Sequence, residues 1–220
     1  MRGPLPAVAL FAALCAACGG VPRDARTTVL SMSQLDTLSG AGRLAKAIAA
    51  EDGVYRVSFD KGRAELTVVA APTIDVLVVA TTHRDPSDTY AIIEGPGQGS
   101  YKSWEVVVPD ADVRTLNADG ADIPEIESSL APGKVTIVDF SAKWCGPCRM
   151  LDAYVTERLR SRKDLAYRKI DILDWDSPVA NHYMSDVRAL PFVIVYGKDG
   201  KEIDRIVGVN PERLEAAIAP

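Results

Sequence analysis

A pair of cysteines at the end of an apolar run constrains the fold of this chain more than any other feature. Residues 135–140 (VTIVDF) are almost all apolar, as expected for a strand covered on both faces of a parallel sheet, and only Asp139 carries a charge. The motif Trp144-Cys145-Gly146-Pro147-Cys148 follows, and residues 149–160 have the pattern of a long helix. We therefore expect a strand, a tight turn carrying two thiols, and a helix, in that order.

The rest of the C-terminal half alternates strand and helix. Further strands are expected at 113–117, within 164–172, at 192–196 and at 203–207, and further helices at 123–130, 176–184 and 211–219. The turn GKDG at 197–200 joins the last two strands as a hairpin. This order predicts an α/β domain over residues 113–220, with one antiparallel edge to its sheet.

Residues 27–109 predict a smaller domain. Strands are expected at 27–32, 54–59, 64–70 and 90–94, and helices at 38–50 and 73–82, although the valines of the second helix make a strand a competitor there. The order β-α-β-β-α-β is the ferredoxin-like α+β pattern. We expect a flexible loop at 95–100, either an edge strand or an interdomain connection at 104–108, and a boundary near 109–112.

The first 18 residues are interpreted as a targeting segment. Apolar residues between 5 and 17 are too few to span a bilayer, which needs about 20, so they predict a secretory signal that is excluded from the fold. Small residues before Cys18 resemble a bacterial lipoprotein cleavage box, although Cys15 stands where that family usually has Leu. The resemblance implies lipid on Cys18, a tether at 19–26, and a place in the bacterial cell envelope, anchored to the membrane and facing the periplasm. Ordinary signal cleavage nearby, or a retained anchor, are the alternatives.

Charge and cysteine usage narrow the functional classes. A net charge of −5 gives no basic surface, so nucleic acid is not an expected partner. With Cys15 and Cys18 in the targeting segment, Cys145 and Cys148 are the thiols left for chemistry. A zinc site usually needs a second ligand pair, which this sequence lacks, and we expect neither a metal nor a cofactor.

The C-terminal half resembles the thioredoxin family over nearly its whole length. The resemblance rests on Val138-Asp139-Phe140, Trp144-Cys145-Gly146-Pro147-Cys148-Arg149-Met150, Arg168-Lys169-Ile170-Asp171, Leu190-Pro191 and Gly208. It implies a thioredoxin fold, which is a central mixed sheet flanked by helices, and a redox disulfide between Cys145 and Cys148.

The two cysteines have different expected roles. Cys145 stands at the start of a helix, where unpaired N–H groups and the helix dipole favour the nucleophilic thiolate. We expect Cys145 to attack a substrate disulfide and the more buried Cys148, one turn later, to resolve the mixed disulfide. Pro147 stiffens the first turn, and Gly146-Pro147 resembles the reducing members of the family.

Asp139 and Lys169 are expected to support this exchange. A carboxyl group in an apolar strand should have a raised pKa, and the resemblance implies that Asp139 is a proton acceptor for Cys148. Lys169 matches the family's lysine near that aspartate, with an exposed strand lysine as the alternative. The family often has a proline in the helix after the cysteines, and Asp152-Ala153-Tyr154 has none.

Three further residues are expected to contact substrate. Trp144 should shield the thiols and offer a contact surface. Pro191 is expected to be cis, with a trans loop proline as the alternative, and the resemblance implies that it exposes the backbone of Leu190 for pairing with an extended substrate.

The N-terminal domain resembles the heavy-metal-associated domain family. The similarity lies in its helix, in the run AEDGVYRVSFDKGRAELTVV, and in the hairpin spacing. That family carries a metal-binding Cys-x-x-Cys after the first strand, whereas residues 31–36 here (SMSQLD) hold no cysteine, so no metal site carries over. Met32 is expected to be a packing residue, and the domain to have a structural or protein-binding role.

Together these features predict an extracytoplasmic thiol–disulfide oxidoreductase that reduces protein disulfides. Outside the cytoplasm its dithiol would need recharging by a membrane thiol relay. A thiol oxidase or disulfide isomerase with the same residues, and a metal-handling or scaffold protein, are the alternatives.

Overall fold

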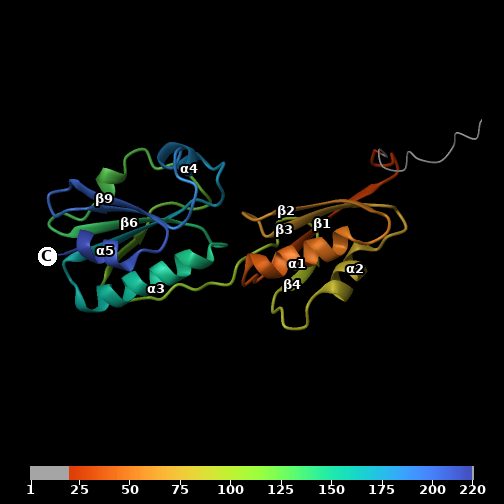
Figure 1. Ribbon diagram of the computed structural model, residues 1–220, viewed down its shortest axis with the longest axis horizontal. Coiled ribbons are helices and arrows are strands. Elements are labelled where there is room, and N and C mark those ends of the chain that lie inside the picture. Colours follow the sequence, from red (N-terminus) through yellow and green to blue (C-terminus); the bar gives the residue numbers. More distant parts are fainter. Residues whose placement is uncertain (1–19, 220) are drawn as a thin grey trace, which may run out of the picture.

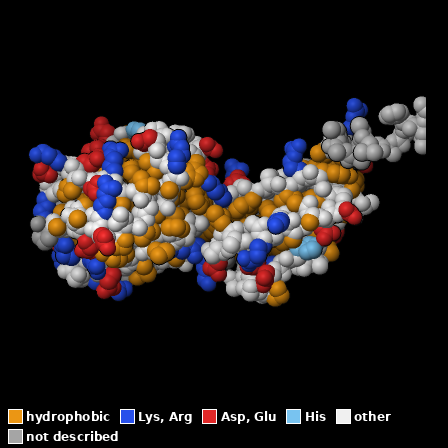
Figure 2. Space-filling view, in the orientation of Figure 1, with side chains coloured by type: hydrophobic (Ala, Val, Ile, Leu, Met, Phe, Trp, Pro, Cys, Tyr) orange, Lys and Arg blue, Asp and Glu red, His pale blue; other side chains and the backbone are white. Residues whose placement is uncertain are grey.

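The computed structural model describes residues 20–219 as two parts, each built around its own sheet (Figure 1). The targeting segment with Cys15 and Cys18 lies outside the described residues. Among the residues that are described, no helix is both long enough and apolar enough to cross a bilayer. In the space-filling view the two parts meet at a narrower waist (Figure 2).

The N-terminal part is a four-stranded antiparallel sheet with two helices. In chain order its elements are β1 (Arg26–Ser33), α1 (Leu38–Ala49), β2 (Val54–Asp60), β3 (Glu65–Ala70), α2 (Val76–His83) and β4 (Ala91–Glu94). The strands lie in the order β2-β3-β1-β4. The predicted ferredoxin-like α+β pattern is confirmed.

Local capping explains why residues 76–83 form a helix despite their valines. The Asp75 side chain accepts a hydrogen bond of 3.0 Å from the backbone N–H of Val78, which caps the helix start. In the core below, Met32 is fully buried with Leu44 and Ile48 of α1. Met32 is therefore a packing residue, as predicted.

The C-terminal part is a five-stranded mixed sheet flanked by helices. Its elements are β5 (Asp112–Thr115), the 3₁₀ turn η1 (Ile126–Ser129), β6 (Val135–Ser141), α3 (Gly146–Ser161), β7 (Leu165–Asp171), α4 (Pro178–Tyr183), β8 (Phe192–Tyr196), β9 (Glu202–Val207) and α5 (Pro211–Ala217). The order is β5-β7-β6-β8-β9, with β5, β7 and β6 parallel and β8 antiparallel to both of its neighbours. The predicted α/β class is confirmed.

The helix predicted at 123–130 is only the single turn η1. Glu125 has an extended backbone, with φ −144° and ψ 101°, so the chain enters its helical turn after Pro124 rather than before it. The segment then stops short of Pro132, and Ile126 alone of the turn is fully buried.

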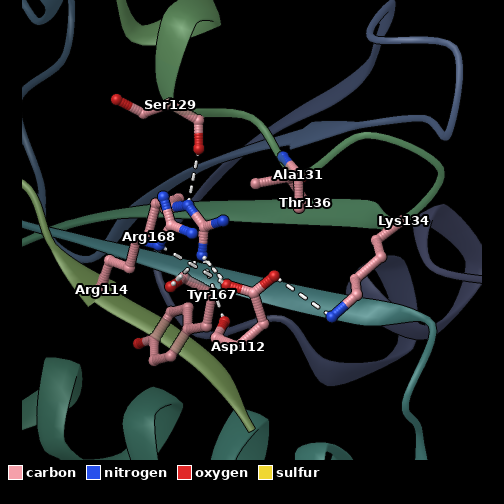
Figure 3. A network of polar contacts seen from close by, with 8 residues as sticks. All are labelled: Asp112, Arg114, Ser129, Ala131, Lys134, Thr136, Tyr167 and Arg168. Carbon is pink, nitrogen blue, oxygen red and sulfur yellow. Dashed lines mark hydrogen bonds and ion pairs between the residues drawn. The ribbon is translucent and has the colours of Figure 1, made fainter.

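A buried arginine ties the edge of this sheet together (Figure 3). Arg168 on β7 is 1% exposed, and its guanidinium donates to Asp112 Oδ1 at 2.8 Å and to the carbonyl oxygen of Ser129 at 2.6 Å. Lys134 Nζ reaches the other Asp112 oxygen at 3.2 Å. One side chain thus joins β5, η1 and β7.

The connection between the two parts is extended. Residues 104–108 form no strand, so of the two predicted alternatives the interdomain connection holds, and Val107 is 87% exposed within it. The glycine-rich loop at 95–100, predicted as flexible, packs tightly: a Cβ on Gly99 would lie 1.9 Å from the carbonyl oxygen of Arg63.

Candidate active site

Cys145 and Cys148 form a disulfide at the start of α3, just beyond the end of β6. The S–S bond is 2.04 Å long, and the two Cα atoms are 5.3 Å apart. Cys145 is the N-cap residue of α3, and its sulfur accepts a hydrogen bond of 3.1 Å from the backbone N–H of Cys148. Pro147 fits the first turn because a proline there loses no helical hydrogen bond.

The two sulfurs differ in exposure. Cys145 is 4% exposed and Cys148 is fully buried, which is the predicted order. After reduction, the first N–H groups of α3 and the positive end of its dipole would act on Cys145. Both effects stabilise a thiolate over a thiol.

Asp139 is fully buried on β6, with Tyr167 donating a hydrogen bond of 2.7 Å to its Oδ2. Among the described residues its Oδ1 has no hydrogen-bond partner. Burial raises the pKa of Asp139 to about 7; the Tyr167 hydrogen bond and Lys169 oppose this rise, while Asp152 adds to it. The predicted upward shift is confirmed.

Lys169 is held by two carboxylates, neither of which belongs to Asp139. The backbone register pairs Asp139 with Lys169 across β6 and β7, so both belong to one face of the sheet. Yet Lys169 Nζ lies 2.9 Å from Asp152 Oδ1 and 2.9 Å from Glu105 Oε1. Burial alone would lower the pKa of Lys169, but the hydrogen bonds to these carboxylates outweigh burial and raise it. Lys169 is therefore neither an exposed lysine nor a direct partner of Asp139.

Trp144 is partly buried between the two parts. Its Nε1 donates to the carbonyl oxygen of Leu173 at 2.5 Å, and its ring centre lies 6.4 Å from that of Trp175. The ring also packs against the N-terminal core. The contact surface that we expected Trp144 to offer is in part already occupied within the chain.

The Leu190–Pro191 peptide bond is cis, as predicted, which excludes the trans alternative. Leu190 is 9% exposed, and Phe192 begins β8 directly after the proline. The backbone N–H of Gly208 donates to the Pro191 carbonyl oxygen at 2.8 Å, which joins this loop to the end of β9.

Sequence reasoning missed the residues that surround Asp139 and Lys169. Asp152 is 3% exposed, and it lies four positions after Cys148 and three before Val155, both of which are fully buried. A charge at that helical spacing was a readable signal of a buried carboxylate. No comparable signal marks Glu105, because only the path of the connection brings it to Lys169. His182 is exposed and contacts Asp122.

A disulfide between cysteines three positions apart, at the N-terminus of a helix, defines a thiol–disulfide oxidoreductase site. The comparisons with known proteins agree. The Thioredoxin family profile matches residues 125–220. Thioredoxin-2 of Saccharomyces cerevisiae is 42% identical over 96 residues, which cover 43% of this chain and 88% of that protein.

Other relatives match the same half. The H-type thioredoxin of Fagopyrum esculentum is 39% identical over 87 residues, covering 40% of this chain and 72% of that protein. The crystal structure of mitochondrial thioredoxin 3 from Saccharomyces cerevisiae in its oxidized form has 30% identity and a TM-score of 0.38, and the match covers 48% of this chain and 92% of that one. The chain belongs to the thioredoxin family through its C-terminal half, and it is a thioredoxin-type disulfide oxidoreductase.

Proposed function

We propose that this chain is an extracytoplasmic reductase of protein disulfides, anchored to the bacterial membrane by lipid on Cys18. The observation that carries the reductase activity is the disulfide at the start of α3, whose resolving sulfur is fully buried. The proposed location rests on the sequence of the first 18 residues alone.

The exchange proceeds in two steps through the reduced protein. The Cys145 thiolate attacks one sulfur of the substrate disulfide, the substrate S–S bond breaks, and its second sulfur leaves as a thiolate that takes up a proton. Cys148 then gives its proton to Asp139, whose pKa of about 7 suits a proton acceptor near neutral pH. The Cys148 thiolate attacks the Cys145 sulfur, forms the disulfide of this structure, and releases the second substrate thiol. The dithiol thus supplies two electrons, while the first substrate thiolate takes its proton from solvent and the second takes the Cys148 proton from Asp139.

Leu190 and Pro191 lie in the loop that enters β8 and are proposed to pair with the substrate backbone. Lys169 is proposed to act on Asp139 through its charge and not by direct contact, since its ammonium group contacts Asp152. Electrons return from a membrane thiol relay, which is the donor class that an extracytoplasmic reductase needs.

The direction of the reaction is tested by the reduction potential of the Cys145–Cys148 couple, measured together with insulin reduction. We expect a potential near that of reducing thioredoxins, about −270 mV, and turnover of insulin disulfides. A potential near about −120 mV, typical of strong periplasmic oxidants, would favour the oxidase alternative.

A trapping experiment tests the roles of the two cysteines. Cys148→Ser should accumulate mixed disulfides with substrate proteins, because the attacking thiol remains and the resolving thiol is gone. Cys145→Ser is the matched control and should trap nothing. Equal trapping by both variants would contradict the assigned roles.

The anchor is tested separately by mass analysis of the mature N-terminus in bacterial membranes. We expect a diacylglycerol-modified Cys18 as the first residue, and release into the soluble fraction in Cys18→Ser. An unmodified N-terminus at another residue would contradict the lipid anchor.

For the N-terminal domain we propose a degenerate heavy-metal-associated domain whose role is protein contact. Where that family holds metal, the side chains here serve the domain's own structure. Ser31 is buried and its hydroxyl donates to the Gly95 carbonyl oxygen at 2.7 Å, while Met32 is enclosed in the core.

A further inference from the structure

The N-terminal part covers one side of the active site. Lys61 lies in the turn at residues 60–63 between β2 and β3, which we call the hairpin tip. Its Nζ is 4.2 Å from the centre of the Trp144 ring and 5.6 Å from that of Trp175. Arg149 Nη2 donates to the carbonyl oxygen of Asp36 at 2.7 Å. The residues directly before Cys145 and directly after Cys148 both contact the N-terminal part.

The hairpin tip also approaches the C-terminal part closely at its backbone. A Cβ on Gly62 would lie 3.2 Å from Leu173 Cγ, which is tighter than most such contacts. Leu173 is the residue whose carbonyl oxygen accepts the Trp144 indole N–H. Figure 1 shows this turn extending toward the start of α3.

The hairpin tip is braced from behind. Within the turn, the backbone N–H of Arg63 donates to Asp60 Oδ1 at 3.1 Å. The hydroxyl of Tyr101 donates to the Lys61 carbonyl oxygen at 2.6 Å, and Gly99 packs against the backbone of Arg63. The glycine-rich loop and the start of the connection thus hold the tip in place.

The segment carrying Asp36 is braced by the same stretch. Leu35 is fully buried; its N–H donates to the Ser100 carbonyl oxygen at 2.8 Å, and its own carbonyl accepts from the N–H of Lys102 at 3.1 Å. Both contacts to the active site therefore come from well-supported backbone.

Other residues around the disulfide are exposed. Gly146 and Pro147 are exposed, Met150 on the next turn of α3 is 65% exposed, and Ala189 before the cis proline is exposed. Cys145 itself shows only 4% of its surface. A substrate can therefore reach the Cys145 sulfur only if it fits beside the N-terminal part.

We propose that the hairpin tip is a specificity determinant: it closes the Trp144 side of the disulfide, so that Cys145 accepts disulfides on narrow, extended segments in preference to disulfides set in broad folded surfaces. This inference rests on the proposed reductase function. A narrow segment enters past Gly146 and Met150, whereas a broad surface collides with the N-terminal part before its sulfur reaches Cys145.

Lys61 is the side chain to test, because its ammonium group lies over the two indole rings. Burial lowers the pKa of Lys61, while Asp174 and Asp176 raise it, which agrees with a contact that excludes water.

The experiment uses the pre-reduced full chain in single-turnover reactions with two substrates. Insulin presents a disulfide on a folded protein, and dithiodipyridine is a small neutral disulfide. The readout is the ratio of the second-order rate constant for insulin to that for dithiodipyridine. We expect Lys61→Ser to raise this ratio severalfold, since the serine no longer covers the rings.

Two further variants make the test specific. Lys61→Met removes the charge but keeps a side chain long enough to cover Trp144, so its ratio should stay near that of the wild type. Lys46→Ser removes an exposed lysine of α1 in the same domain and should leave the ratio unchanged. The folded state of each variant is checked by its thermal unfolding transition.

The outcomes separate this inference from the proposed function. Wild-type protein that reduces both substrates, with an unchanged ratio in folded Lys61→Ser, would overturn the hairpin tip as a specificity determinant. Equal rises in Lys61→Ser and Lys61→Met would also overturn it, because charge and not cover would then control access. Wild-type protein that reduces neither substrate would overturn the reductase function itself, and this inference with it.

Discussion

The charged groups around Asp139 are arranged differently from what the sequence predicts. Lys169 is turned toward Asp152 and Glu105, so the side-chain hydrogen bond to the buried carboxyl group comes from a neutral phenol, Tyr167. A second buried carboxylate, Asp152, raises the pKa of Asp139 further. Asp139 thus stays protonated up to near neutral pH because it is buried and because Lys169 is turned away from it.

The raised pKa of Asp139 predicts an unusual dependence of stability on pH. The folded protein keeps this proton to about pH 7, whereas an unfolded aspartate loses it near 3.8. The stabilising contribution is therefore full below about pH 4 and is lost as the pH rises to about 7. We expect Asp139→Asn to be more stable than the wild type at pH 8, by about 2 to 4 kcal/mol, with little difference near pH 4.

Urea unfolding at these two pH values measures this effect. Asp186→Asn, at an exposed position in the same half, is the control and should follow the wild type at both. An Asp139→Asn variant that loses stability at pH 8 would show that the carboxylate is not destabilising there.

Asp152 predicts a shift in the Asp139 titration itself. In Asp152→Asn a negative neighbour is removed and Lys169 retains only Glu105 as a charged partner. Both changes favour the carboxylate form, so the pKa of Asp139 should fall. Carbon-13 NMR titration of the Asp139 carboxyl group measures it directly. Glu157→Gln on the exposed side of α3 is the control, and an unchanged pKa in Asp152→Asn would contradict the coupling.

Arg168 predicts a large effect on stability. Replacement by Met leaves Asp112 without its buried partner and frees the carbonyl oxygen of Ser129. We expect a loss of about 3 kcal/mol in the free energy of unfolding, measured by urea denaturation. Arg160→Met, which breaks an exposed ion pair on α3, should cost less than about 1 kcal/mol. Similar losses in the two variants would contradict the role of burial.

At the scale of elements, local patterns predicted most of the fold. The apolar run of β6 and the cysteine motif at the start of α3 each set their own structure from a few neighbouring residues. The exception is η1, where Glu125 keeps an extended backbone. The redox disulfide and the cis proline were predicted from the resemblance to the thioredoxin family.

The rest of the site depends on contacts between distant segments. Glu105 reaches Lys169, and Lys61 reaches Trp144, across the boundary between the two parts. No spacing along the chain encodes either pairing, because both follow from how two separate sheets are joined. Sequence reasoning therefore located the sulfur chemistry but not what covers it.

The glycine-rich loop predicts a strong position dependence of Gly→Ala changes. In Gly99→Ala the new Cβ would lie 1.9 Å from the Arg63 carbonyl oxygen, so the loop and the hairpin tip must separate. We expect a loss of about 2 kcal/mol in stability, measured by thermal or urea unfolding. Gly42→Ala in α1 meets nothing within 4 Å and should gain up to about 1 kcal/mol. A neutral Gly99→Ala would contradict the close packing.

At the scale of the whole molecule, two separate cores are joined by one exposed connection. Val106 is 50% and Val107 87% exposed, in a segment without regular hydrogen bonding. Such segments are preferred sites of proteolysis. We expect brief elastase treatment to cut within residues 104–108 before it cuts elsewhere in residues 20–219, as identified by mass spectrometry. First cleavage inside either sheet would contradict this expectation.

The pairing of Glu105 with Lys169 has a consequence for how the chain can be divided. A C-terminal fragment starting at β5 would keep both cysteines and Asp139 but would lose the carboxylate that shares Lys169 with Asp152. Without Glu105, the Lys169 ammonium group would interact more evenly with Asp152 and Asp139. The pKa of Asp139 would therefore fall. Asp139 would thus be a stronger acid in the isolated half than in the intact protein. Fusing this half to a different domain would change the acidity of Asp139 as well as the substrates that can reach the site.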